Sequence, residues 1–133
     1  MPNEKRGEIH SPERARQLRN FSGLLFGNIT PTDIDGLIEY HDKGYVIIEL
    51  KYRDAEILRG QELALERMTD DFQRAKKKAL CIIATHQEDN PQISINVADT
   101  IVTKYRYLYK WTIPKETCLT HVLIEWFFEH KFN

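Results

Sequence analysis

The sequence predicts an α/β domain with a mixed central sheet flanked by helices, and three observations support this. Residues 33–40 and 44–52 each alternate between the two faces of a strand with a period of two. Residues 61–79 instead carry apolar side chains at steps of three and four, as one face of a helix does. The run "ALCIIATH" at 79–86 is short and continuously apolar, which is typical of a strand buried on both faces. A chain of 133 residues can bury one hydrophobic core, so we expect a single domain over residues 1–133.

The N-terminal region predicts a helix over about residues 12–20. Ser11 suits the N-cap, Pro12 suits the first helical position, and Glu13 is favourable near the positive end of the helix dipole. The following segment "FSGLLFGNITPT" contains two glycines and a proline, which predicts an irregular connector.

A β-hairpin is expected next, with strands over about residues 33–40 and 44–52. The turn "HDKG" joins them, and Gly44 is the residue expected to adopt a positive φ. A helix then follows, whose apolar stripe consists of Gln61, Leu65, Met68, Phe72, Ala75 and Ala79. The basic run "RAKKK" at 74–78 suits the solvated C-terminal end of this helix.

The C-terminal part predicts further strands and a last helix. After "ALCIIATH", "IVTKYRYLYKW" at 101–111 alternates as a strand, and the penultimate strand is less defined, near "QISIN" at 92–96. An amphipathic helix follows Thr117, with His121, Glu125 and Glu129 opposite its apolar side. The resulting order is αββαββα.

Composition excludes several classes of protein. No apolar run is long enough to span a bilayer, and "MPNEKRGEIH" lacks the apolar segment of a secretory signal, so a cytoplasmic protein without membrane association is expected. Cys81 and Cys118 have neither a zinc nor a redox spacing. The net charge of −1 argues neither for nor against nucleic acid, because local patches set the field at a binding face.

The hairpin carries an unusual concentration of charge. Glu49 and Lys51 share one face of their strand, and Asp33 and Asp35 share one face of the other. If the turn has an odd number of residues or a bulge at Gly44, Asp35 lies across from Glu49. Clustered carboxylates suit Mg²⁺, which takes one or two of them together with water, and a nearby ammonium can stabilise charge during phosphodiester hydrolysis.

This arrangement, Asp35 followed by "ELK" on a hairpin between helices, resembles the PD-(D/E)XK nuclease superfamily over about residues 11–86. The resemblance implies the restriction-endonuclease-like α/β fold and Mg²⁺-dependent hydrolysis of DNA, with Mn²⁺ as a substitute. It also implies that Asp35, Glu49 and the carbonyl of Leu50 bind the metal and that Lys51 assists catalysis. Small nucleases of this type often dimerise, so a homodimer is one expected state.

Two assignments keep an alternative. Asp33 is the other aspartate of the motif, and we favour Asp35 because "DIDGLIE" follows it with a small residue and an apolar continuation. Gln61, in the first turn of the next helix, is expected to point toward the sheet. Some branches of the superfamily have a glutamine there that positions water or substrate, whereas a residue that only hydrogen-bonds locally at the helix start would look the same.

In "TKYRYLYKW", Lys104, Arg106 and Lys110 are expected on one face, opposite three tyrosines, where they could follow a phosphate backbone. An edge strand that uses lysine to discourage pairing has the same pattern. The function expected is thus a DNA nuclease. The alternatives are a catalytically silent DNA-binding or assembly module on the same fold and a protein-interaction domain.

Overall fold

The computed structural model describes residues 13, 17–115 and 117–131, and the chain divides into two units, residues 1–31 and 32–133. In the first unit, the short 3-10 helix η1 (Ser22–Leu24) precedes an isolated bridge between Phe26 and Ile29, with Gly27 at a φ of 62°. Most of the helix predicted over residues 12–20 lies outside the described residues, and residues 17–20 are not helical. The expectation of one domain over the whole chain stays a prediction.

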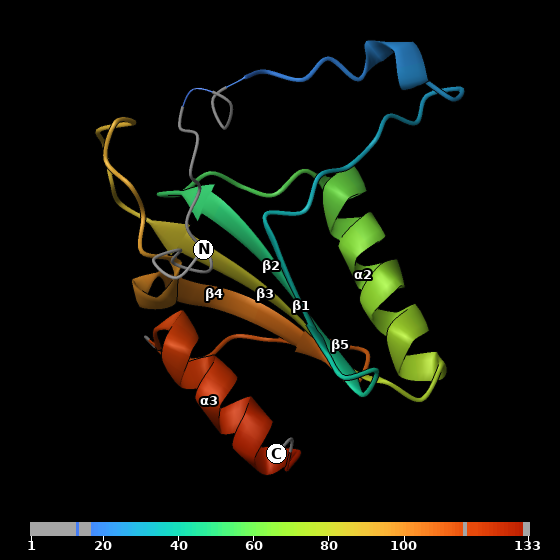
Figure 1. Ribbon diagram of the computed structural model, residues 1–133, viewed down its shortest axis with the longest axis vertical. Coiled ribbons are helices and arrows are strands. Elements are labelled where there is room, and N and C mark those ends of the chain that lie inside the picture. Colours follow the sequence, from blue (N-terminus) through green and yellow to red (C-terminus); the bar gives the residue numbers. More distant parts are fainter. Residues whose placement is uncertain (1–12, 14–16, 116, 132–133) are drawn as a thin grey trace, which may run out of the picture. The chain divides into compact units, whose positions relative to one another are not determined.

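The second unit is built on a five-stranded sheet with the strand order β1-β2-β3-β4-β5 (Figure 1). Its strands are β1 (Gly36–Tyr40), β2 (Gly44–Tyr52), β3 (Lys78–His86), β4 (Ile101–Tyr107) and β5 (Lys110–Thr112). Only β2 and β3 are parallel, and helix α2 (Arg59–Arg74) makes the crossover that a parallel pair needs. The predicted mixed sheet flanked by helices is confirmed, whereas the restriction-endonuclease-like assignment stays a prediction.

Alternation along the central strands gives the sheet two apolar faces, each with its own helix. Helix α3 (Leu119–Glu129) covers the face formed by the buried residues Val46, Ile48, Leu80, Ile82, Ala84 and Val102. Helix α2 covers the opposite face through Leu65, which packs with Ile47 and Cys81. The α2 face has the smaller apolar cluster, because charged side chains occupy its remaining positions. No helix in the described part of the chain is long and apolar enough to cross a membrane.

The first hairpin has the odd loop that the charge pattern requires. Tyr40 pairs with Gly44, so three residues form the loop, and Lys43 N–H donates to the Tyr40 carbonyl at 2.8 Å. The positive φ angles belong to His41 (47°) and Asp42 (63°), so the prediction for Gly44 is wrong. Polar residues tolerate this left-handed region when they can bond locally, as aspartate can. The last pair of the ladder is Gly36 with Ile48, and extending this register by one residue places Asp35 across from Glu49.

Helix α2 is shorter at its C-terminal end than predicted. It ends at Arg74, and Lys76 adopts a φ of 70°, which turns the chain out of the helix. Lys77 N–H then donates to the Phe72 carbonyl at 3.1 Å, the long bond of a Schellman-type end. Ala79 consequently belongs to β3 rather than to the helix, although Leu65, Met68 and Phe72 do pack against the sheet as their spacing predicts.

The strand predicted over residues 101–111 is a hairpin. Leu108 and Tyr109 both have positive φ, 49° and 67°, and reverse the chain between β4 and β5. Lys110 pairs with Tyr107, so it lies on the tyrosine face, and the prediction that it shares a face with Lys104 and Arg106 is wrong. Residues 92–96 form no strand, which corrects the expectation for "QISIN".

Candidate functional site

Strand β2 directs Glu49 and Lys51 toward the α2 face, and the alternation of side chains along a strand predicts that the two share a face. Glu49 is buried, with its side chain 5% exposed, and Lys51 is 21% exposed. The Lys51 Nζ atom lies 3.7 Å from Glu49 Oε1. The register of the hairpin adds the Asp35 carboxyl group beside Glu49. The structure therefore brings the three charged groups of the predicted motif together at the end of one hairpin, while their roles stay predictions.

Glu49 is in an environment that is unfavourable for its charge. Burial, together with the neighbouring Asp35 carboxyl group, raises the pKa of Glu49 to about 7, against the smaller opposing effects of Lys51 and Gln61. Its Oε2 atom is buried and has no hydrogen-bond partner among the described residues. A buried carboxylate oxygen without a partner is costly to keep, so its presence calls for a group that would satisfy it.

Helix α2 delivers Gln61 to the same place. Gln61 lies in the first turn of the helix and its Oε1 atom accepts a hydrogen bond from Lys51 Nζ at 3.0 Å. The glutamine therefore points toward the sheet, as its position on the apolar stripe predicts. The bond holds the lysine stem between helix and sheet, so the ammonium has a defined position.

Asp35 stands one residue before β1 and bonds to the backbone of the opposite strand. Its Oδ2 atom accepts the Leu50 N–H at 2.8 Å, where β1 no longer provides a ladder partner. In a strand, the N–H and C=O of one residue point toward the same neighbour, so the Leu50 carbonyl also lies on the side of Asp35. Asp33 precedes β1 and is exposed.

These groups fit a hard divalent cation. Mg²⁺ prefers oxygen ligands, takes few carboxylates and keeps waters, and the site offers Glu49 Oε2, the Asp35 carboxylate and the Leu50 carbonyl. No cluster of three or more His, Cys, Asp or Glu side chains suited to a metal lies in the described part of the chain. A metal here would therefore depend on two carboxylates, one carbonyl and water.

The basic residues of β4 form ion pairs with carboxylates of α2. Lys104 Nζ lies 2.6 Å from Glu62 Oε2, and Arg106 makes a bidentate pair with Asp70 at 3.0 and 2.8 Å. The hydrogen bond from Lys104, with Arg59 assisting, holds the pKa of Glu62 below its usual value. Lys104 and Arg106 are thus part of the interface between α2 and the sheet, and of the three predicted DNA-binding residues only Lys110 is exposed.

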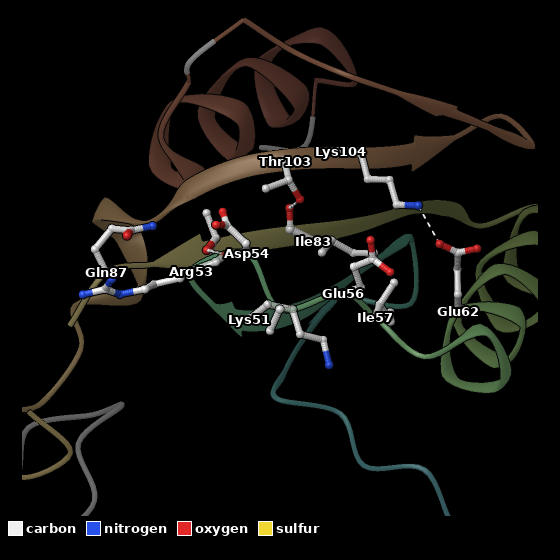
Figure 2. Close-up of a pocket in the computed structure, with 12 residues that line it drawn as sticks. Lys51, Arg53, Asp54, Glu56, Ile57, Glu62, Ile83, Gln87, Thr103 and Lys104 are labelled. Carbon is white, nitrogen blue, oxygen red and sulfur yellow. Dashed lines mark hydrogen bonds and ion pairs between the residues drawn. The ribbon is translucent and has the colours of Figure 1, made fainter. Parts of the chain in front are cut away.

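Lys51 also lines a cavity of about 480 Å³ (Figure 2). The loop after β2 forms one wall, and β3 and β4 form the floor. At the floor, Ile83 pairs with Lys104 while Ala84 pairs with Val102, so Thr103 is an extra residue in β4. This β-bulge lets the consecutive residues Thr103 and Lys104 both line the cavity, because a bulge re-aims a side chain that regular alternation would send to the other face.

The sequence alone did not reveal Glu62, Asp70 or the residues that line the cavity besides Lys51 and Lys104. Glu62 follows Gln61 directly, and its spacing from Arg59 is a helical ion-pair signal that indicates only a solvated face. Its partner Lys104 is far away in the chain, so the pairing depends on the crossover of α2. The bulge at Thr103 has no local sequence signal, since neither glycine nor proline marks it.

No family model, no curated protein and no solved structure matches this chain. The functional argument therefore depends on the site itself.

Proposed function

We propose that this protein is a Mg²⁺-dependent nuclease that hydrolyses phosphodiester bonds in DNA, on a fold like that of the PD-(D/E)XK nucleases. The observation that carries the proposal is the buried Glu49 carboxyl group, whose Oε2 atom has no partner in the described part of the chain and which has both Asp35 and Lys51 as neighbours. A surface hairpin with simple cross-strand ion pairs would not bury an unsatisfied carboxylate.

In this proposal, Asp35, Glu49 and the Leu50 carbonyl hold the ion. When bound, Mg²⁺ would polarise the phosphoryl oxygen and lower the pKa of an attacking water. Both carboxylates are presented by adjacent elements of one hairpin, and the Leu50 amide orients Asp35. The ligand set is thus positioned before any metal arrives, which reduces the ordering cost of binding.

Lys51 is proposed to stabilise the negative charge that develops on the phosphoryl group. Its ammonium is close to Glu49 and directed by Gln61, so it would lie beside a phosphate bound at the carboxylates. Preorganised charge of this kind acts without reorganisation during the reaction. Gln61 is a positioning residue in this scheme, because its amide oxygen contacts the lysine.

Metal titration and cleavage assays on wild type, Glu49→Ala and Lys51→Ala test the proposal. Mg²⁺ and Mn²⁺ should support binding and cleavage of DNA by the wild type, whereas Ca²⁺ should support binding alone, because it takes more ligands at longer distances. Lys51→Ala should still bind the ion but cut about 100-fold more slowly or worse. Glu49→Ala should weaken metal binding itself, and Glu125→Ala, an exposed glutamate of α3, should behave as wild type.

The assays should use linear, single-stranded and branched DNA, with metal binding followed by calorimetry. A wild type that binds no divalent ion and cuts none of these substrates in Mn²⁺ would overturn the proposal. A wild type that binds both the ion and DNA without cutting would assign the chain to the silent binding modules instead.

A further inference from the structure

We propose that the cavity beside Lys51 receives one unpaired nucleotide of the DNA strand, with its phosphate near Lys51 and Lys104 and its base toward Asp54 and Gln87. The inference rests on the proposed function and goes beyond it, because it names the form of DNA that the site accepts: a single strand or a frayed end rather than an intact duplex.

The position and size of the cavity support this. Lys51 belongs both to the carboxylate site and to the lining of the cavity, so a strand that places one phosphate at the site can place the adjacent nucleotide in the cavity. Its volume of about 480 Å³ lies within the range of small-molecule sites and is too small for a base pair with its backbone.

The charges lining the cavity orient the nucleotide. Figure 2 shows Lys104 and Glu62 near one end of the cavity and Arg53 and Gln87 near the other. Lys104 is paired with Glu62, and Lys51 with Gln61, yet an ammonium has three donors and both retain donors for a phosphate. Arg53 is held by Asp89 outside the cavity lining, so the two lysines are the cations best placed for the phosphate.

The other lining groups suit a nucleobase. In the described part of the chain, no hydrogen bond or ion pair holds the side chains of Asp54, Glu56 or Gln87, so their acceptors are free. Carboxylates repel a phosphate but accept hydrogen bonds from the amino group of cytosine, as they do in base recognition. Ile57 and Ile83 provide apolar contact for the ring. The lining thus combines an apolar surface with acceptors for an amino-bearing base.

A paired cytosine can offer its amino group only at the groove edge, so a base enters the cavity as a whole only when it has left its partner. Enzymes that hold a base in a pocket take it from single-stranded DNA or extrude it from the duplex at the cost of pairing and stacking. The protein should therefore bind single-stranded DNA more tightly than a blunt duplex of the same sequence, and oligo(dC) more tightly than oligo(dT), because thymine has no amino group.

The test is fluorescence anisotropy with labelled oligonucleotides in Ca²⁺, using the full chain. Ala55→Trp places a large side chain in the cavity lining, and Ala64→Trp makes the same change at an exposed position of α2 outside it. Ala55→Trp should weaken single-strand binding about tenfold, on the order of one lost base contact, and Ala64→Trp should leave it unchanged. Asp54→Ala, a milder change, should abolish the preference for oligo(dC) over oligo(dT).

Hydrolysis of bis(p-nitrophenyl) phosphate in Mn²⁺ separates this inference from the proposed function, because that substrate needs the carboxylate site but not the cavity. Ala55→Trp should retain this activity. If Ala55→Trp and Asp54→Ala both bind oligonucleotides as wild type does, or if wild type prefers the blunt duplex, the cavity proposal is wrong. If wild type hydrolyses neither DNA nor the aryl ester, the nuclease proposal fails, and the binding comparison still decides the cavity.

Discussion

At the scale of single residues, Glu49 is the most informative group in the protein. Its carboxyl group is buried beside a second carboxyl group, and its pKa is raised to about 7. Between pH 4.5 and pH 7, the unfolded chain ionises this group more readily than the folded protein does. The contribution of Glu49 to stability is therefore greatest below pH 4.5 and is lost as the pH rises through 7.

The first prediction follows from this loss of stability with rising pH. Without divalent ions, Glu49→Gln should gain stability relative to wild type as the pH rises from 4.5 to 8, by on the order of 2 kcal/mol. Urea unfolding at several pH values in EDTA measures the difference. Glu56→Gln is the matched control and should show no such trend, because Glu56 is exposed and has no hydrogen bond or ion pair among the described residues. A constant difference between Glu49→Gln and wild type would contradict the raised pKa.

The two aspartates before β1 give the second prediction. Asp35→Asn keeps an oxygen that can accept the Leu50 N–H but loses the charge, so the fold should remain while metal affinity falls by about 10- to 100-fold. Asp33→Asn is the matched control and should stay close to wild type. Calorimetric titration with Mn²⁺ and a cleavage assay rank the two variants, and the reverse ranking would assign the motif to Asp33.

At the scale of elements, helix α2 is attached to the sheet by ionic contacts as well as by apolar ones. Asp70 and Arg106 are each 12% exposed and make a bidentate pair, and Lys104 binds Glu62 one residue after Gln61. Trp111 Nε1 also donates to Glu66 at 2.7 Å, and Lys104 Nζ lies 4.4 Å from the centroid of the Trp111 ring. These contacts set the orientation of the helix and thereby the place of Gln61.

The third prediction concerns this attachment. Asp70→Ala should destabilise the protein by about 3 kcal/mol, because it leaves the largely buried Arg106 guanidinium without its carboxylate. The neighbouring pair of Asp71 and Arg74 is exposed, so Asp71→Ala should cost less than about 1 kcal/mol. Urea unfolding compares the two adjacent substitutions. Equal costs would mean that the pair at Asp70 contributes no more than a surface ion pair.

At the scale of the whole molecule, the net charge gives DNA no overall attraction. It is −1, and two of the three basic residues predicted to bind nucleic acid, Lys104 and Arg106, are each paired with a carboxylate of α2. The carboxylates of the site would also repel a phosphate. Binding of DNA should therefore depend on the divalent ion that the site is proposed to hold.

The fourth prediction is that DNA affinity rises at least about tenfold from EDTA to Ca²⁺, and that the affinity in Ca²⁺ falls with added salt as phosphate neutralisation requires. Anisotropy titrations at several salt concentrations measure both effects, with Glu49→Ala as the variant that should lose the response to Ca²⁺. Tight binding in EDTA would instead indicate a basic surface that acts without metal, as expected of a silent binding module.

Local pattern was sufficient for much of this protein. Alternation predicted the strands around Glu49 and Lys51, and helical spacing predicted the face of α2 that packs on the sheet, because both depend on neighbours in the chain. Alternation also predicted Asp35 across from Glu49 on condition of an odd loop or a bulge at Gly44, and the structure has the odd loop. Only the tertiary structure decided which residues from distant parts of the chain these elements contact. The crossover of α2 gave Lys104 and Arg106 carboxylate partners, the turn at Leu108 moved Lys110 to the other face, and the bulge at Thr103 shaped the cavity. Long-range pairing and loop closure have no local periodicity, so only the folded chain reveals them.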